Sequence, residues 1–250
     1  MTFAQFLLVA AAGLAAGVIN SIAGAGSLIT FPALLAVGLP PLQANVSNSI
    51  GLVAGSLSGA WGYRAELKGQ SGRVARFCAI AGTGGLLGAF LLLRLPGRVF
   101  EVAIPALVAI ASVLVVAQPW VSRRLRREGD RPVALAIGLF LVGVYGGYFG
   151  AAQGIMLLAV MGLFLAVPLQ RANAFKTLIA GTANAISGVV FIVLAPVSWP
   201  HAVVLGLSSL AGGRIGAAVA QRVPDRPLQL GVGIFGLVVA LRLALAFHLF

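Results

Sequence analysis

Long runs of apolar residues recur along the whole chain, and they constrain its fold more than any other feature of the sequence. A straight helix needs about 20 apolar residues to cross a bilayer. Strands of a membrane β-barrel would instead alternate apolar and polar residues over segments of roughly ten. The runs here are continuous and rich in Leu, Ala, Gly and Val. The sequence therefore predicts an all-α polytopic membrane protein.

Composition and charge placement support a lipid bilayer as the surroundings of this chain. Of its 250 residues, 60% are hydrophobic and only 9% are charged, whereas soluble domains are about a quarter charged. The net charge of +12 could suggest nucleic acid. However, Lys and Arg concentrate in the short connections between apolar runs, as the positive-inside rule expects. We therefore expect a bilayer and no nucleic acid as partner.

The number of transmembrane segments follows from the lengths of the apolar runs. Segment 26–38 is short for a crossing and segment 151–167 is marginal. These two either cross as broken helices or re-enter, so the sequence predicts eight to ten transmembrane segments. The runs are approximately 3–21, 26–38, 44–63, 74–94, 99–121, 132–149, 151–167, 173–196, 200–220 and 228–249.

Basic connections suggest how the segments are oriented. The connection 63–76 and the run "SRRLRREGDR" at 122–131 are both strongly basic, so both are expected on the cytoplasmic side. If all segments cross, the connection around Arg171 is also cytoplasmic and both termini lie outside. The rival topology with two re-entrant segments has eight crossings. It places Arg171 and Lys176 outside, which the charge bias disfavours.

The two halves of the chain contain similar stretches in the same order. "GVINSIAGAG" at 17–26 aligns with "GVYGGYFGAA" at 143–152, and "PLQANVSNS" at 41–49 aligns with "PLQRANAFKT" at 168–177. Each half then holds five segments, and an odd number inverts the second half relative to the first. Inverted repeats with short, Gly- or Pro-interrupted segments are typical of secondary transporters.

This duplication predicts the domain organisation. We expect a first transmembrane repeat at 1–121, a basic cytoplasmic linker at 122–131 and a second transmembrane repeat at 132–250. Backbone that leaves the helix at Gly24–Gly26 or Gly38–Pro41 frees N–H and C=O groups. Such groups are tolerated at membrane depth only where they face protein or a water-filled cavity.

Glycines, prolines and asparagines recur through the first half in one pattern, namely Gly17, Asn20, Gly24–Gly26, Pro32, Gly38, Pro40, Ala44–Asn45, Asn48–Ser49 and Gly55. With this pattern the first half resembles a known family, the TauE/SafE sulfite exporters, also called the 4-toluene sulfonate uptake permeases. The resemblance extends over the full length and implies a carrier in the bacterial inner membrane for small sulfur oxyanions or sulfonates. In the second half the family more often has a glycine run and a proline, where this chain has Gly150–Gln153 and no proline within 151–167.

An anion carrier needs hydrogen-bond donors, and the N-termini of broken helices supply them. The alternative is that the same polar groups cap the broken helices and hydrogen-bond across helix interfaces. Lys176 is either a cation facing the anion path or a snorkelling side chain at the interface, and the same choice applies to Arg214. The candidate substrate-binding residues are Asn20, Ser21, Gly24, Gly26, Ser27, Asn45, Asn48, Ser49, Gln153, Asn173, Lys176 and Thr177.

Other classes of function find little support in the sequence. Cys78 is the only cysteine, and His201 and His248 are isolated, so we expect no metal site. We also expect no cofactor and no enzymatic activity. The sequence predicts a secondary transporter for a small organic or inorganic anion, and the family resemblance implies export of a sulfur-containing anion such as sulfite or a sulfonate. A non-transporting accessory subunit and an anion channel remain the alternatives, and a homo-oligomer is compatible with the sequence.

Overall fold

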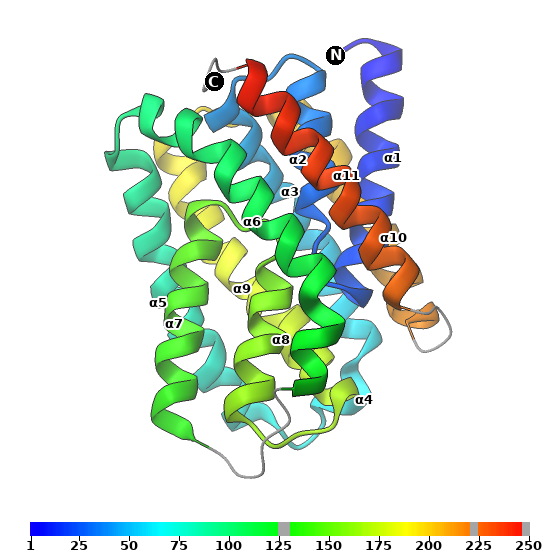
Figure 1. Ribbon diagram of the computed structural model, residues 1–250, viewed down its shortest axis with the longest axis vertical. Helices are drawn as coiled ribbons and strands as arrows, with labels where there is room; N and C mark the ends of the chain where they lie inside the picture. Colours follow the sequence, from blue (N-terminus) through cyan, green and yellow to red (C-terminus); the bar gives the residue numbers. More distant parts are fainter. Residues whose placement is uncertain (125–130, 221–224, 247–250) are drawn as a thin grey trace.

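Helices make up all the regular secondary structure in the computed structural model, which describes residues 1–124, 131–220 and 225–246 (Figure 1). This confirms the predicted all-α class. The linker predicted at 122–131 lies largely outside the described residues. The helices are α1 (Phe3–Ile22), α2 (Ser27–Ala36), α3 (Pro41–Gly62), α4 (Arg64–Leu67), α5 (Ser71–Arg94), α6 (Gly97–Arg124), α7 (Pro132–Tyr148), α8 (Gln153–Phe164), α9 (Leu169–Leu194), α10 (Trp199–Val219) and α11 (Asp225–Ala246).

Several of these helices are suited to a bilayer. Among the described residues, 6 helices are long and apolar enough to cross a membrane, namely α1, α5, α6, α9, α10 and α11. Helices α2, α7 and α8 are apolar but shorter. Large apolar side chains such as Phe3, Val193 and Leu207 are mostly exposed on the outside of the bundle, where lipid rather than water suits them. The chain is therefore a multi-pass membrane protein.

The two short segments, 26–38 and 151–167, fold back along the helices that precede them. The Gln5 side-chain amide, at the start of α1, donates to the Val37 carbonyl at the end of α2 over 3.2 Å. The Arg131 N–H, before α7, donates to the Phe164 carbonyl at the end of α8 over 3.0 Å. Thus α1–α2 and α7–α8 are helical hairpins. They open toward opposite ends of the bundle (Figure 1).

Chain direction alternates from segment to segment, and this places the basic connections together. Helix α4 packs against α9, so the connections around Arg64 and Arg171 share one end of the bundle (Figure 1). The start of α1 and the end of α11 lie at the other end (Figure 1). The basic connections therefore share one end, as in the ten-segment topology favoured by charge and unlike the eight-crossing alternative. Whether the two short segments cross the bilayer stays a prediction.

The two halves pack on each other through matching pairs of helices. Helix α1 packs on α10 and, in the same way, α7 packs on α5, while α3 packs on α9 and α6 on α11, so all four contacts join the halves. Glycine lets the backbones approach closely: a Cβ added to Gly17 would lie 2.3 Å from the Ser209 carbonyl oxygen, and one added to Gly143 would lie 2.3 Å from that of Ala81. These matching contacts are compatible with a duplication, while the inverted repeat itself stays a prediction.

Close packing of α1 on α10 predicts a clear stability difference between two glycines. Gly17→Ala inserts a methyl group against the α10 backbone and is expected to destabilise the protein by about 1–3 kcal/mol, as overpacking does. Gly231→Ala is the matched control, because a Cβ there meets nothing within 4 Å. Thermal unfolding in detergent measures both variants. A melting temperature for Gly17→Ala at or above that of Gly231→Ala would contradict this packing.

Candidate functional site

The bends of the two hairpins meet each other inside the bundle. Gly24 has a φ of 78° and Gly150 a φ of 77°, in the left-handed region where glycine is favoured. The Gly154 N–H donates to the Gly24 carbonyl over 3.2 Å. A Cβ on Gly24 would lie 2.7 Å from the Gly154 Cα, so only glycine permits this approach. The bends therefore place the starts of α2 and α8 side by side.

Side chains from both halves satisfy the backbone of the first bend. The Asn20 side-chain oxygen accepts a hydrogen bond from the Gly26 N–H over 2.8 Å. The Lys176 ammonium, from α9, donates to the carbonyls of Ser21 and Ile22 over 3.3 and 3.1 Å. It also donates to the Asn173 side chain over 3.1 Å. Lys176 is buried, and its charge suits the negative C-terminal end of α1.

The second bend is supported in a matching way. The Asn45 side-chain amide, from α3, donates to the Tyr148 carbonyl at the end of α7 over 3.0 Å. The Tyr145 hydroxyl donates to the Ala151 carbonyl over 2.7 Å. Asn45 is aligned with Asn173, which accepts from Lys176 beside the first bend. Each half thus supplies side chains that support the broken helix of the other. This is the capping role that the sequence left open beside substrate binding.

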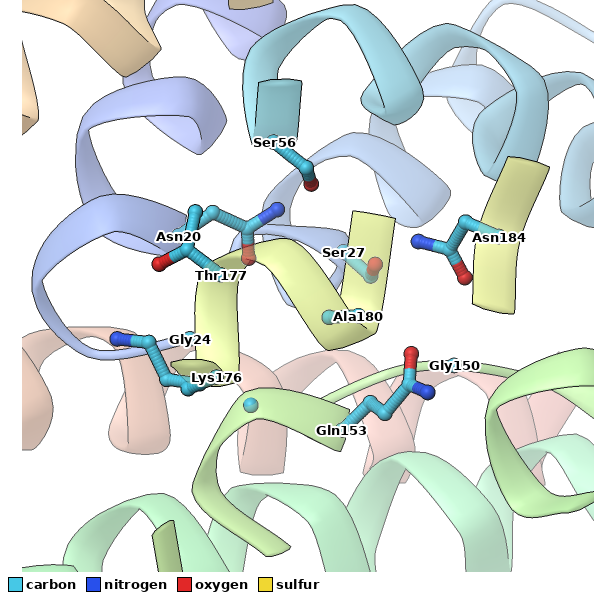
Figure 2. A pocket seen from close by; sticks show the side chains of 11 residues that line it. Asn20, Gly24, Ser27, Ser56, Gly150, Gln153, Lys176, Thr177, Ala180 and Asn184 are labelled. Atoms are coloured by element: carbon cyan, nitrogen blue, oxygen red, sulfur yellow. The ribbon is translucent and has the colours of Figure 1, made fainter. Parts of the chain in front are cut away.

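A polar cavity lies where the two bends meet (Figure 2). The space not filled by atoms at this site is about 340 Å³, part of which is open to solvent, and about 20 Å³ of it admits the centre of a water molecule. That is room for roughly one water, so a larger ligand requires the walls to move. The lining residues are Asn20, Gly24, Ser27, Ser56, Gly150, Gln153, Gly154, Lys176, Thr177, Ala180 and Asn184.

The cavity gathers half of the residues that the sequence nominated. Asn20, Gly24, Ser27, Gln153, Lys176 and Thr177 line it. The nominated residues outside the lining are Ser21, Gly26, Asn45, Asn48, Ser49 and Asn173.

Most of the nominated residues outside the lining have structural hydrogen bonds instead. Asn48 accepts a hydrogen bond from the Thr30 hydroxyl, and the Ser49 hydroxyl donates to the Asn45 carbonyl. The Ser21 hydroxyl donates to the Gly213 carbonyl on α10. The bonds of Asn48 and Ser21 join neighbouring helices, and that of Ser49 lies within α3. These are the capping and packing roles that the sequence analysis gave as the alternative. Arg214 is exposed and also lies outside the lining.

Sequence reasoning missed Ser56 and Asn184, although a signal for them existed. Each lies eleven residues after an asparagine of the repeated motif, since 56 − 45 and 184 − 173 are both 11. Eleven residues make about three turns of helix, so Asn45 and Ser56 share a face of α3, as Asn173 and Asn184 do on α9. This shared spacing on two matching helices could have predicted Ser56 and Asn184 as lining residues.

The ends of two helices give the cavity a positive potential. Ser27 and Gln153 are the first residues of α2 and α8, so both helices direct their N-terminal, partly positive ends at it. Such ends favour anions, although the N–H groups at the start of α8 already donate within the protein. The lining includes one lysine and no carboxylate. This combination favours an anion and gives a cation no charged ligand.

Gln153 is the lining residue most suited to contact a ligand. Its side chain is 2% exposed and points toward the centre of the cavity (Figure 2). Neither its amide nitrogen nor its amide oxygen has a hydrogen-bond partner among the described residues. Gly146 makes room for the amide, because a Cβ there would lie 2.1 Å from the Gln153 nitrogen. Buried amides normally have partners, so this side chain is poised for one from a ligand or water.

Comparison with known proteins gives matches over almost the full length. The family model for "Sulfite exporter TauE/SafE" matches residues 9–243. The "Probable membrane transporter protein ORF9" of Sinorhizobium sp is 27% identical over 239 residues, which cover 95% of this chain and 91% of that protein. The "Probable membrane transporter protein YfcA" of Escherichia coli K12 is 28% identical over 236 residues, covering 93% and 87%. A "Probable membrane transporter protein" of Haemophilus influenzae is 30% identical over 210 residues, covering 82% and 81%.

The different roles of the asparagines lead to a stability prediction. Asn45→Ala leaves the buried Tyr148 carbonyl without its side-chain donor and is expected to cost about 1–3 kcal/mol. Asn184→Ala removes an amide that has no hydrogen bond to the described residues, so the stability should change little. Unfolding of both purified variants in detergent is compared with that of the unmodified protein. Equal losses in the two variants would argue against a specific role of Asn45 at the second bend.

Proposed function

Because the chain belongs to the sulfite exporter TauE/SafE family, we propose that this bacterial membrane transporter is a secondary carrier that exports a small anion through the cavity between its two helix bends. The observation that carries the proposal is Gln153, a buried amide that points into this cavity and has no hydrogen-bond partner in the described part of the chain. The N-terminal ends of α2 and α8 and the Lys176 ammonium supply positive potential around it.

A small oxyanion fits the donors of this site. Its several oxygen atoms can each accept a hydrogen bond, and the lining offers amides at Asn20, Gln153 and Asn184 and hydroxyls at Ser27 and Ser56. The family's description names sulfite, whereas the names of the relatives state no substrate. We therefore propose a sulfur-containing anion such as sulfite or a sulfonate as the cargo.

A carrier mechanism suits the narrow interior of the cavity. With room for roughly one water, the site admits an oxyanion only when its walls move apart. The hairpins α1–α2 and α7–α8 open toward opposite ends of the bundle (Figure 1). Rocking of such hairpins against each other would expose a central site to one side of the membrane at a time. This supports a carrier over a channel, which needs a continuous open path.

The first test is anion efflux from liposomes that contain the purified protein. Sulfite, sulfate and ethanesulfonate are loaded in turn, with and without a pH gradient. We expect saturable efflux of at least one anion. It should be stimulated by the same anion on the other side, as for a carrier and unlike a channel. Absence of efflux for every anion from folded protein would contradict the proposal and favour the accessory-subunit alternative.

Variants of the lining residues test where the anion binds. Gln153→Ala and Asn184→Ala are expected to lower efflux about tenfold or more, because a hydrogen bond to a charged group contributes about 1.5–3 kcal/mol. Arg214→Gln is the matched control, since Arg214 is exposed and outside the lining. Folding is verified by thermal unfolding of each variant. Unchanged efflux in both lining variants would remove the cavity from the transport path.

A further inference from the structure

We propose that the substrate carries a hydrogen-bond donor beside its negative charge, and that Gln153 selects for this donor. The inference rests on the proposed function and deepens it. It concerns which anions the cavity accepts, and it separates protonated oxyanions and hydroxy- or amino-substituted sulfonates from anions that only accept hydrogen bonds.

Gln153 presents two chemically opposite ends to whatever enters the cavity. Its amide nitrogen donates hydrogen bonds and its amide oxygen only accepts them. Both atoms are buried, and neither has a hydrogen-bond partner in the residues that the structure describes. Gly146 lies close against the amide and provides no side chain. The complementary partner must therefore accept from the nitrogen and donate to the oxygen.

An oxyanion without a proton satisfies only half of this requirement. It accepts from the Gln153 nitrogen, but it has nothing to offer the Gln153 oxygen and repels it electrostatically. A water molecule can serve both ends of the amide, so replacing water by such an anion leaves the oxygen unpaired. Sites built around a buried polar group reject analogues that leave it unpaired. A ligand with a hydroxyl or ammonium group beside its charge avoids this loss.

Other lining residues also combine donors with acceptors. The Thr177 hydroxyl donates to the Asn173 carbonyl over 2.8 Å, so its lone pairs are what it can offer a ligand. Asn184 supplies another side-chain amide to the cavity besides that of Gln153 (Figure 2). Its nitrogen donates and its oxygen accepts hydrogen bonds. Asn20 is different, because its oxygen already accepts from Gly26 and its nitrogen remains as a donor. The lining thus has acceptors as well as the donors that an anion needs.

A matched pair of sulfonates tests this selectivity directly. Ethanesulfonate and 2-hydroxyethanesulfonate have the same charge and differ by one hydroxyl group. Each is added as a competitor of sulfite efflux from liposomes that contain the protein. Each is also tested for thermal stabilisation of the purified protein, which reports binding independently of sulfite. We expect 2-hydroxyethanesulfonate to act at about tenfold lower concentration in both measurements, because it alone pairs the buried oxygen.

Two glutamine variants assign the preference to its residue. Gln153→Met keeps a similar shape but removes both polar ends, so the two sulfonates should become nearly equivalent. Gln170→Met is the control. The Gln170 side-chain oxygen is also buried and has no hydrogen-bond partner among the described residues, but Gln170 does not line the cavity. This control should keep the preference of the unmodified protein.

The outcomes separate this inference from the proposed function. Equal action of the two sulfonates on the unmodified protein, with sulfite efflux intact, overturns the inference and leaves the carrier function standing. A preference that persists in folded Gln153→Met overturns the role of Gln153. If Gln153→Met does not fold, the sulfonate pair on the unmodified protein still decides whether a donor is required. If the unmodified protein neither transports sulfite nor binds either sulfonate, the proposed function is overturned together with the inference.

Discussion

The structure depends on satisfying the backbone groups that two broken helices release inside a membrane. Lipid offers these groups no hydrogen bonds, so the protein must supply every partner. At the first bend the partner is Lys176, which donates to the carbonyls of Ser21 and Ile22. At the second it is Asn45, which donates to the carbonyl of Tyr148. Because each partner comes from the opposite half, neither bend is complete without the other half of the chain.

This exchange of partners separates two roles among the polar residues of α3 and α9. Near the start of each helix, Asn45 and Lys176 hold the bends. Further along, Ser56 and Asn184 line the cavity without a hydrogen bond to the described residues. Lys176 and Thr177 take part in both, since they line the cavity and bond to protein. Residues of the first kind give the site its shape, and those of the second kind remain available to a ligand.

Close packing by glycine makes this central arrangement reachable. The bends touch at Gly24 and Gly154, where any side chain would collide with backbone. Outside them, α1 lies on α10 and α7 on α5 with backbones in contact. Attraction between helices in lipid comes from such packing rather than from the hydrophobic effect. The glycines at these contacts are therefore the residues that let the two hairpins enter the bundle from opposite ends.

Length and spacing of the apolar runs were sufficient to determine the membrane class, the helical fold and the two interrupted segments. The motifs around Asn20, Asn45 and Asn48 identified the family. Which polar residues face the cavity was decided only by tertiary structure. Periodicity places Asn45 and Ser56 on one face of α3, but what that face meets depends on contacts with residues more than a hundred positions away, such as Tyr148. For the same reason the sequence predicted both Asn48 and Lys176 as substrate-binding residues. In the fold, Asn48 is hydrogen-bonded to Thr30 and only Lys176 lines the cavity.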